Sequence, residues 1–102
     1  MNILLICAAG MTTSILVNNM RKFADPSDKI SAYPLVFLSE HIQDCDVILV
    51  GPQTSHMFKV IEDEAKALGK GVAMMDPTAL AKVDGAVMYQ QAKDLYESLP
   101  KL

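Results

Sequence analysis

The feature that most constrains the fold is a short apolar run near the N-terminus that ends in a cysteine. Residues 3–6 are Ile-Leu-Leu-Ile, Cys7 follows them, and a loop of small residues then leads into a stretch with apolar residues at helical spacing. An uninterrupted apolar run of this length is typical of a strand that is buried on both faces of a parallel sheet. The pattern therefore predicts a cysteine at the carboxyl end of a central strand, directly before a helix.

The rest of the chain divides into alternating strands and helices. A second apolar run at 46–51 predicts another central strand, whereas Pro34 places its own strand at an edge, because proline cannot donate a backbone hydrogen bond. Apolar residues recur at three- and four-residue steps over 55–68, which indicates an amphipathic helix. The expected strands are 2–7, 30–36, 46–51 and 71–75, and the expected helices are 12–24, 55–68 and 85–99.

Turn-forming residues separate these elements. Asp-Pro-Ser-Asp at 25–28 ends the first helix, Gly69 is expected to be the C-cap of the second, and Asp76 is expected to cap the turn after the last strand. Alternating strands and helices favour parallel strands joined by right-handed crossovers. We therefore predict an α/β fold with a single open four-stranded parallel sheet in the order 2-1-3-4, helices on both faces, and a flavodoxin-like or phosphatase-loop-like architecture.

Length, charge and hydropathy argue against several classes of function for this chain. A chain of 102 residues with 51% hydrophobic residues has room for one domain over 1–102, and a net charge of −3 with dispersed Lys and Arg leaves no basic patch for nucleic acid or anionic lipid. No apolar run reaches about 18 residues and no signal peptide is visible, so we expect a cytoplasmic protein with free thiols at Cys7 and Cys45. His41 and His56 belong to no ligand-spaced cluster, and no metal is expected.

The loop after the first strand suits an anion-binding site built around a sulfur atom. In open parallel sheets, ligands bind at the carboxyl edge, and a helix N-terminus there favours both an anion and a thiolate. Small side chains let the backbone close around an oxyanion, and Thr12 is expected to be the N-cap of the helix. The alternative is that Cys7 is a small buried hydrophobic residue and the threonines only cap a helix. The candidate residues are Cys7 as nucleophile, with Ala8, Ala9, Gly10, Met11, Thr12, Thr13 and Ser14 around it.

Three segments resemble one protein family. Cys-Ala-Ala-Gly-Met-Thr-Thr-Ser at 7–14 resembles the phosphocysteine loop of the IIB components of the sugar phosphotransferase system, lactose/cellobiose (chitobiose, lichenan) type. The resemblance continues through Asp-Val-Ile-Leu-Val-Gly-Pro-Gln at 46–53 and Lys-Val-Asp-Gly at 82–85. One difference is that family members often have serine where this chain has Ala8 and Thr12.

The resemblance implies a phosphoryl relay without a cofactor. A phosphohistidine on a IIA partner would donate to Cys7, and Cys7 would donate to a sugar of the cellobiose or chitobiose type held by a IIC permease in the membrane. The loop from Ala8 to Ser14 would hold the phosphoryl group. The protein would then be a monomer that meets the inner face of the membrane only transiently, through IIC.

Three other functions are weighed against this one. A low-molecular-weight tyrosine phosphatase also has a cysteine after its first strand, but its pattern requires an arginine six positions later, where this chain has Thr13. A thiol redox protein would be expected to have a Cys-x-x-Cys motif, which is absent. A non-catalytic binding module is compatible with the fold alone.

A few further residues are expected near the carboxyl edge. Pro52 and Gln53 line the site or merely end the third strand, and His56 lies close enough in sequence to reach the same edge. Met11 is the best candidate for an adaptable apolar contact with a partner protein. The other methionines are expected in the core, with Met20, Met57, Met74, Met75 and Met88 among them.

Overall fold

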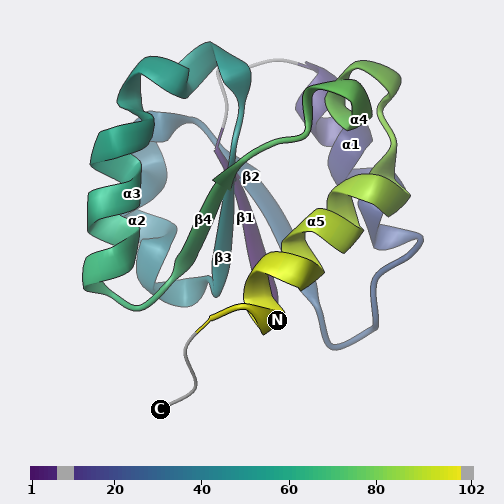
Figure 1. Cartoon of the computed structure of the whole chain (residues 1–102). Helices are drawn as coiled ribbons and strands as arrows, with labels where there is room; N and C mark the ends of the chain where they lie inside the picture. Colours follow the sequence, from purple (N-terminus) through teal and green to yellow (C-terminus); the bar gives the residue numbers. More distant parts are fainter. Residues whose placement is uncertain (7–10, 100–102) are drawn as a thin grey trace.

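Four parallel strands form the centre of the protein. The computed structural model describes residues 1–6 and 11–99, and its sheet has the order β2-β1-β3-β4, as the sequence predicts. Figure 1 shows this sheet between two groups of helices. The strands are β1 (Asn2–Ile6), β2 (Lys29–Tyr33), β3 (Val47–Val50) and β4 (Gly71–Met74).

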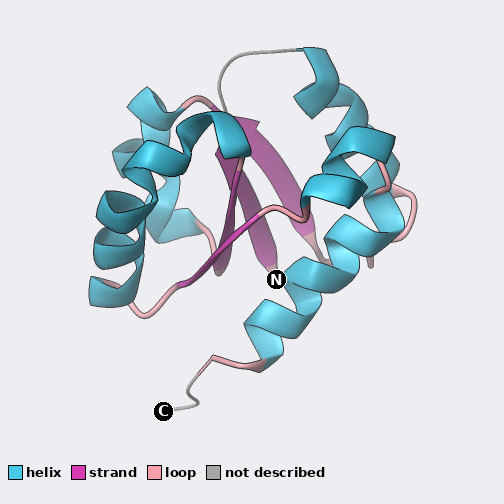
Figure 2. Ribbon diagram, turned by 45° about the horizontal axis from the view of Figure 1, so that its top comes forward, coloured by secondary structure: helices cyan, strands magenta, loops and turns pink. Residues whose placement is uncertain are grey.

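Helices cover both faces of the sheet, which confirms the predicted fold class (Figure 2). One face carries α2 and α3, and the other carries α1, α4 and α5 (Figure 1). The helices are α1 (Met11–Arg21), α2 (Leu38–His41), α3 (Phe58–Ala67), α4 (Pro77–Lys82) and α5 (Gly85–Glu97).

The two central strands are apolar throughout because each supplies side chains to two cores. In β1, Ile3 and Leu5 point into the core under α1 and α5, whereas Leu4 and Ile6 point into the core under α2 and α3. Every residue of β3 is also buried. Full burial of one such side chain contributes about 1.5–3 kcal/mol, so these strands have few alternative positions in the fold.

The segment after β2 differs from the prediction. The expected strand over 30–36 ends at Tyr33, because Pro34 has no N–H for a ladder and directly precedes a 3-10 helix, η1 (Leu35–Phe37). The short helix α2 and a second 3-10 helix, η2 (Ile42–Asp44), follow without a break. None of these three short helices was expected.

The first helix also has different ends. It begins at Met11, so the prediction of Thr12 as N-cap is wrong, since residue 12 lies in the first helical turn. It ends at Arg21 rather than near residue 24, because the N–H groups of Lys22 and Phe23 bond to carbonyls three residues back. This tighter last turn precedes the turn at 25–28.

The helix α3 ends at the predicted place, although its C-cap is Leu68 and Gly69 is the residue that follows it. Gly69 has a φ of 74°, and the N–H of Lys70 donates to the carbonyl of Ala65 at 2.8 Å, as in a Schellman motif.

The helix α4 was not expected from the sequence. The expected turn at Asp76 instead opens this helix, with a proline at its first position. An acidic cap followed by proline is a recognised helix start.

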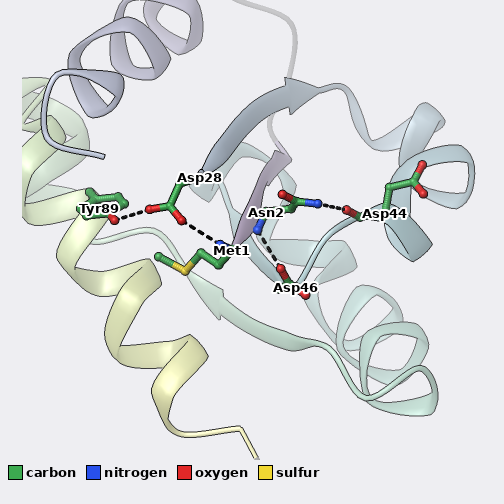
Figure 3. Close-up of polar contacts among 6 residues, drawn as sticks. All are labelled: Met1, Asn2, Asp28, Asp44, Asp46 and Tyr89. Carbon is green, nitrogen blue, oxygen red and sulfur yellow. Dashed lines mark hydrogen bonds and ion pairs between the residues drawn. The ribbon is translucent and has the colours of Figure 1, made fainter. Parts of the chain in front are cut away.

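Polar contacts tie the amino edge of the sheet to distant parts of the chain (Figure 3). The Met1 ammonium donates to the Asp28 carboxylate at 2.7 Å, and the Tyr89 hydroxyl on α5 donates to the same carboxylate. The Asn2 N–H donates to the Asp46 carboxylate at 2.7 Å. Burial alone would raise the pKa of Asp28, but the two hydrogen bonds outweigh it and hold the pKa below its usual 3.8.

Candidate functional site

All four strands end level with one another at the carboxyl edge of the sheet. Ile6 pairs with Tyr33 on one side and with Val50 on the other, and Val50 pairs with Met74. The ladder extends one step further, because the N–H of Gly51 donates to the carbonyl of Ile6 at 2.7 Å. The connections that follow the strands therefore gather at one edge, which is where open parallel sheets bind ligands.

In the sequence, the predicted nucleophile loop begins directly after β1 and runs into α1. Cys7, Ala8, Ala9 and Gly10 lie outside the described residues. Residues 11–13 form the start of α1, and Ser14 is exposed on the same helix. The described ends of β1 and α1 thus agree with the predicted order of strand, loop and helix, while the roles of the loop residues stay predictions.

The N-terminus of α1 offers a favourable electrostatic environment for an anion. The first N–H groups of any α-helix have no partner within the helix, and its dipole gives that end a partial positive charge. The first turn of α1 contains no acidic residue, and Arg21 lies in its last turn. No carboxylate of the helix itself therefore competes with a bound anion at this end.

The connection after β3 is a 3-10 helix, η3 (Pro52–Met57). It follows a strand that pairs directly with β1, the strand before the predicted nucleophile loop. Pro52 and His56 are exposed, while Thr54 is buried and its hydroxyl donates to the Gly51 carbonyl at 3.0 Å. Gln53 belongs to the same 3-10 helix. Thr54 therefore supports the turn itself, and contact of Pro52, Gln53 or His56 with a ligand stays a prediction.

A glutamine that the sequence analysis missed fixes the turn after β4. Gln91 on α5 donates through its side-chain amide to the carbonyl of Met74 at 2.7 Å and accepts from the N–H of Asp76 at 3.0 Å. The Asp76 carboxylate accepts from the N–H groups of Thr78 and Ala79 at 2.8 and 3.0 Å. The predicted capping role of Asp76 is confirmed, and nothing in the sequence pattern indicated Gln91.

The second cysteine lies away from this edge and is chemically quiet. Cys45 precedes β3, is 4% exposed, and donates through Sγ to the carbonyl of Ile42 at 3.1 Å. Burial raises the pKa of its thiol to about 11. Cys45 is therefore a packed, protonated thiol, and the free thiol expected there is confirmed.

One aromatic pair and two absences complete the description of residues 1–6 and 11–99. The His41 ring stacks on Tyr33 with centroids 3.7 Å apart and planes at 12°. Among residues 1–6 and 11–99, no three His, Cys, Asp or Glu side chains are placed to hold a metal ion. No helix in those same ranges has the length and apolar character needed to span a bilayer.

Comparison with known proteins agrees with the strand, loop and helix arrangement. The model of the family described as "PTS system, Lactose/Cellobiose specific IIB subunit" matches residues 2–92. The chain is 33% identical over 96 residues to the PTS system oligo-beta-mannoside-specific EIIB component of Bacillus subtilis (strain 168), and the match covers 91% of this chain and 93% of that protein.

Solved structures support the same assignment. A solution structure of a cellobiose-specific phosphotransferase IIB component from Borrelia burgdorferi superposes with a TM-score of 0.80 at 30% identity, and it covers 100% of this chain and 96% of that one. A lactose-specific IIB domain from Streptococcus pneumoniae has a TM-score of 0.81 at 16% identity, covers 94% and 97%, and bears on the fold alone. With a family match over residues 2–92, this chain belongs to the lactose/cellobiose-specific IIB subunits of the phosphotransferase system.

Proposed function

We propose that the protein carries a phosphoryl group on Cys7, between a IIA phosphohistidine and a sugar held by a IIC permease. Family membership already gives the chain a general role in phosphoryl transfer to sugars. The observation that supports the finer proposal most directly is that β1 ends at Ile6, at the carboxyl edge of the sheet, so that Cys7 is the next residue in the sequence.

Both steps of the proposed relay are displacements at phosphorus. In the first step the Cys7 thiolate attacks, an S–P bond forms, the N–P bond of the donor breaks, and the imidazole leaves with the electron pair. In the second step a sugar hydroxyl attacks, an O–P bond forms, the S–P bond breaks, the hydroxyl proton is lost, and the thiolate is restored. Such reactions need an in-line arrangement and stabilisation of charge on the equatorial oxygens.

The chain's residues suit transfer better than hydrolysis. Backbone N–H groups at the start of α1 stabilise an anion, but position 13 is threonine, so the loop has no guanidinium there to clamp a phosphate bidentately. A carrier must release what it accepts, and moderate stabilisation of the thiophosphate serves that purpose. Cys45, the other thiol, is protonated near neutral pH and enclosed in the core.

The names of the relatives suggest the linkage class of the sugar that receives the phosphoryl group. The Bacillus relative is named for oligo-beta-mannosides and the Borrelia structure for cellobiose, which are both β-linked saccharides. We extend this chemistry to the present chain, so that its substrate is a β-linked oligosaccharide of the cellobiose or chitobiose type. The protein would act in the cytoplasm as a monomer and reach the membrane through IIC, and Pro52 and Gln53 would line the site.

Phosphorylation in a reconstituted system tests the proposal. The protein is incubated with phosphoenolpyruvate, the general phosphotransferase proteins and a matched IIA, and any added phosphate is located by intact-mass and peptide mass spectrometry. We expect one acid-sensitive phosphate on Cys7, absent in Cys7→Ala and retained in the matched variant Cys45→Ala. Phosphate on another residue, or hydrolysis of an aryl phosphate without a stable adduct, would overturn the proposal.

A further inference from the structure

We propose that Asn19 is a positioning residue for phosphoryl transfer, because it fixes α1 against α5 and thereby sets the position of the N-terminus of α1, the helix that follows the candidate nucleophile Cys7 in the sequence. The inference rests on the proposed carrier function. It concerns a residue that lies outside the candidate loop and has no chemistry of its own.

The first observation is a hydrogen bond between two helices that are distant in sequence. The Asn19 side-chain oxygen accepts from the N–H of Gly85, 66 residues away, at 2.9 Å. Gly85 is the first residue of α5, and its N–H has no partner within that helix. The Asp84 side chain accepts from the N–H of Val87, so Asn19 and Asp84 share the capping of α5.

The second observation is a close approach of the two backbones at the same point. A Cβ atom added to Gly85 would lie 2.5 Å from the carbonyl carbon of Asn19 and 2.5 Å from the nitrogen of Met20. Real Cβ atoms essentially never come so near to backbone. Only glycine fits there, so the absence of a side chain at residue 85 allows the two helices to meet. The hydrogen bond from Gly85 to Asn19 then holds α1 at one position along the axis of α5.

Other contacts hold the same half of α1. The Arg21 guanidinium donates to the carbonyl of Ile30 at 3.1 Å, which ties the end of the helix to β2. Leu16 and Met20 are fully buried against the sheet and α5, whereas Ile15 in the N-terminal half is 57% exposed. Among the α1 residues whose side chains are described, 14–21, the buried ones thus begin at the middle of the helix.

A helix transmits a displacement along its length. From Asn19 back to Met11 the helix rises about 12 Å, at roughly 1.5 Å per residue, and a shift or tilt at Asn19 moves the N-terminal turn. A misplacement of about 1 Å can slow a positioned reaction by roughly 100-fold. The N–H groups and dipole of that turn also favour the thiolate of a neighbouring cysteine.

Three variants separate positioning from simple loss of stability. Asn19→Ala removes the acceptor for the Gly85 N–H, whereas Asn19→Asp keeps an oxygen in its place. Ile61→Val removes one methyl group from the core on the opposite face of the sheet, where Ile61 is fully buried, and serves as the destabilised control.

The measurements are transfer from phospho-IIA under steady-state conditions and the pH profile of Cys7 alkylation. For Asn19→Ala we expect kcat to fall about 10-fold or more with little change in KM, and the alkylation midpoint to rise by about 0.5 pH unit. Asn19→Asp and Ile61→Val should stay within about two-fold of the wild type in kcat. If Asn19→Ala does not fold, Asn19→Gln, which displaces the amide by one methylene group, replaces it with the same expected loss.

The outcomes distinguish this inference from the proposed function. A wild-type protein that gains no phosphate on Cys7 refutes the carrier function, and with it this inference. A phosphorylated wild type together with an Asn19→Ala variant that behaves like Ile61→Val in both measurements refutes the positioning role alone. Failure of Asn19→Asp to restore transfer would also contradict it, since the acceptor oxygen would then be irrelevant.

Discussion

Replacement of Gly85 by alanine is the most direct test of the contact between α1 and α5. Within a helix, alanine is normally favoured over glycine by about 1 kcal/mol, so a variant without steric conflict would gain stability. Here the added methyl group would lie 2.5 Å from backbone atoms of Asn19 and Met20, which cannot rotate away. Overpacking of this kind costs about 1–3 kcal/mol, and the strained hydrogen bond to Asn19 adds about 1 kcal/mol. These two costs together are about 2–4 kcal/mol, and the helix propensity of alanine offsets about 1 kcal/mol, so we expect Gly85→Ala to be destabilised by about 1–3 kcal/mol.

Urea denaturation at neutral pH measures the loss of free energy of unfolding, and the slope m should stay unchanged. For a domain of this size the expected decrease in Tm is roughly 10 °C. The result is read against two other glycine variants. In Gly71→Ala the new methyl would meet the side chains of Leu95 and Leu99 at 3.0 and 3.1 Å, and these atoms can yield. In Gly69→Ala there is no steric contact, and the cost of about 1 kcal/mol comes from the φ of 74°.

The order of the three variants decides the question. We expect Gly85→Ala to be the least stable of the three, because only there does the added methyl group meet backbone. A Gly85→Ala protein as stable as the wild type, or more stable than Gly71→Ala, would show that α1 and α5 slide apart without penalty. The close approach would then have no positional meaning, and the role inferred for Asn19 would lose its geometric basis.

Four further predictions concern single residues. Tyr89→Phe removes a donor to Asp28 and should lower the free energy of unfolding in urea by about 1 kcal/mol. Because the folded pKa of Asp28 is lowered, its contribution is complete above 3.8 and is lost as the pH falls through the folded pKa, so thermal melts of Asp28→Asn should show a weaker loss of stability in acid than the wild type. Asp76→Ala removes the cap of α4 and should cost about 1 kcal/mol by thermal denaturation. Iodoacetamide at neutral pH should modify Cys7 far faster than Cys45 in the native protein, and both at similar rates in urea, as followed by peptide mapping.

The central part of the fold could be predicted because its sequence signal is local. Residues 3–6 and 47–50 are apolar without interruption, and burial on both faces of the sheet is the physical reason. The strand order β2-β1-β3-β4 follows from right-handed crossovers together with Pro34, which favours an edge position. These rules depend only on neighbouring residues and chain geometry.

The segments that could not be predicted are short or are defined by distant partners. The helix α2 has four residues, which is too few to show a helical period. The early end of α1 depends on how its last turn tightens before residue 25. Asn19 and Gln91 are single polar residues within amphipathic helices, and their partners lie 66, 15 and 17 positions away. Only the assembled structure brings these residues together.

The two edges of the sheet use polar side chains in different ways. At the amino edge, Asp28 binds the Met1 ammonium and Asp46 binds the N–H of Asn2, the first residue of β1. At the carboxyl edge, Gln91 and Asp76 bind the backbone of the turn after β4. The start of α1, in contrast, has no acidic residue of its own to neutralise its dipole. A helix without an acidic cap of its own gains from contacts elsewhere along its length, and the contact between Asn19 and Gly85 lies eight residues beyond the start of α1.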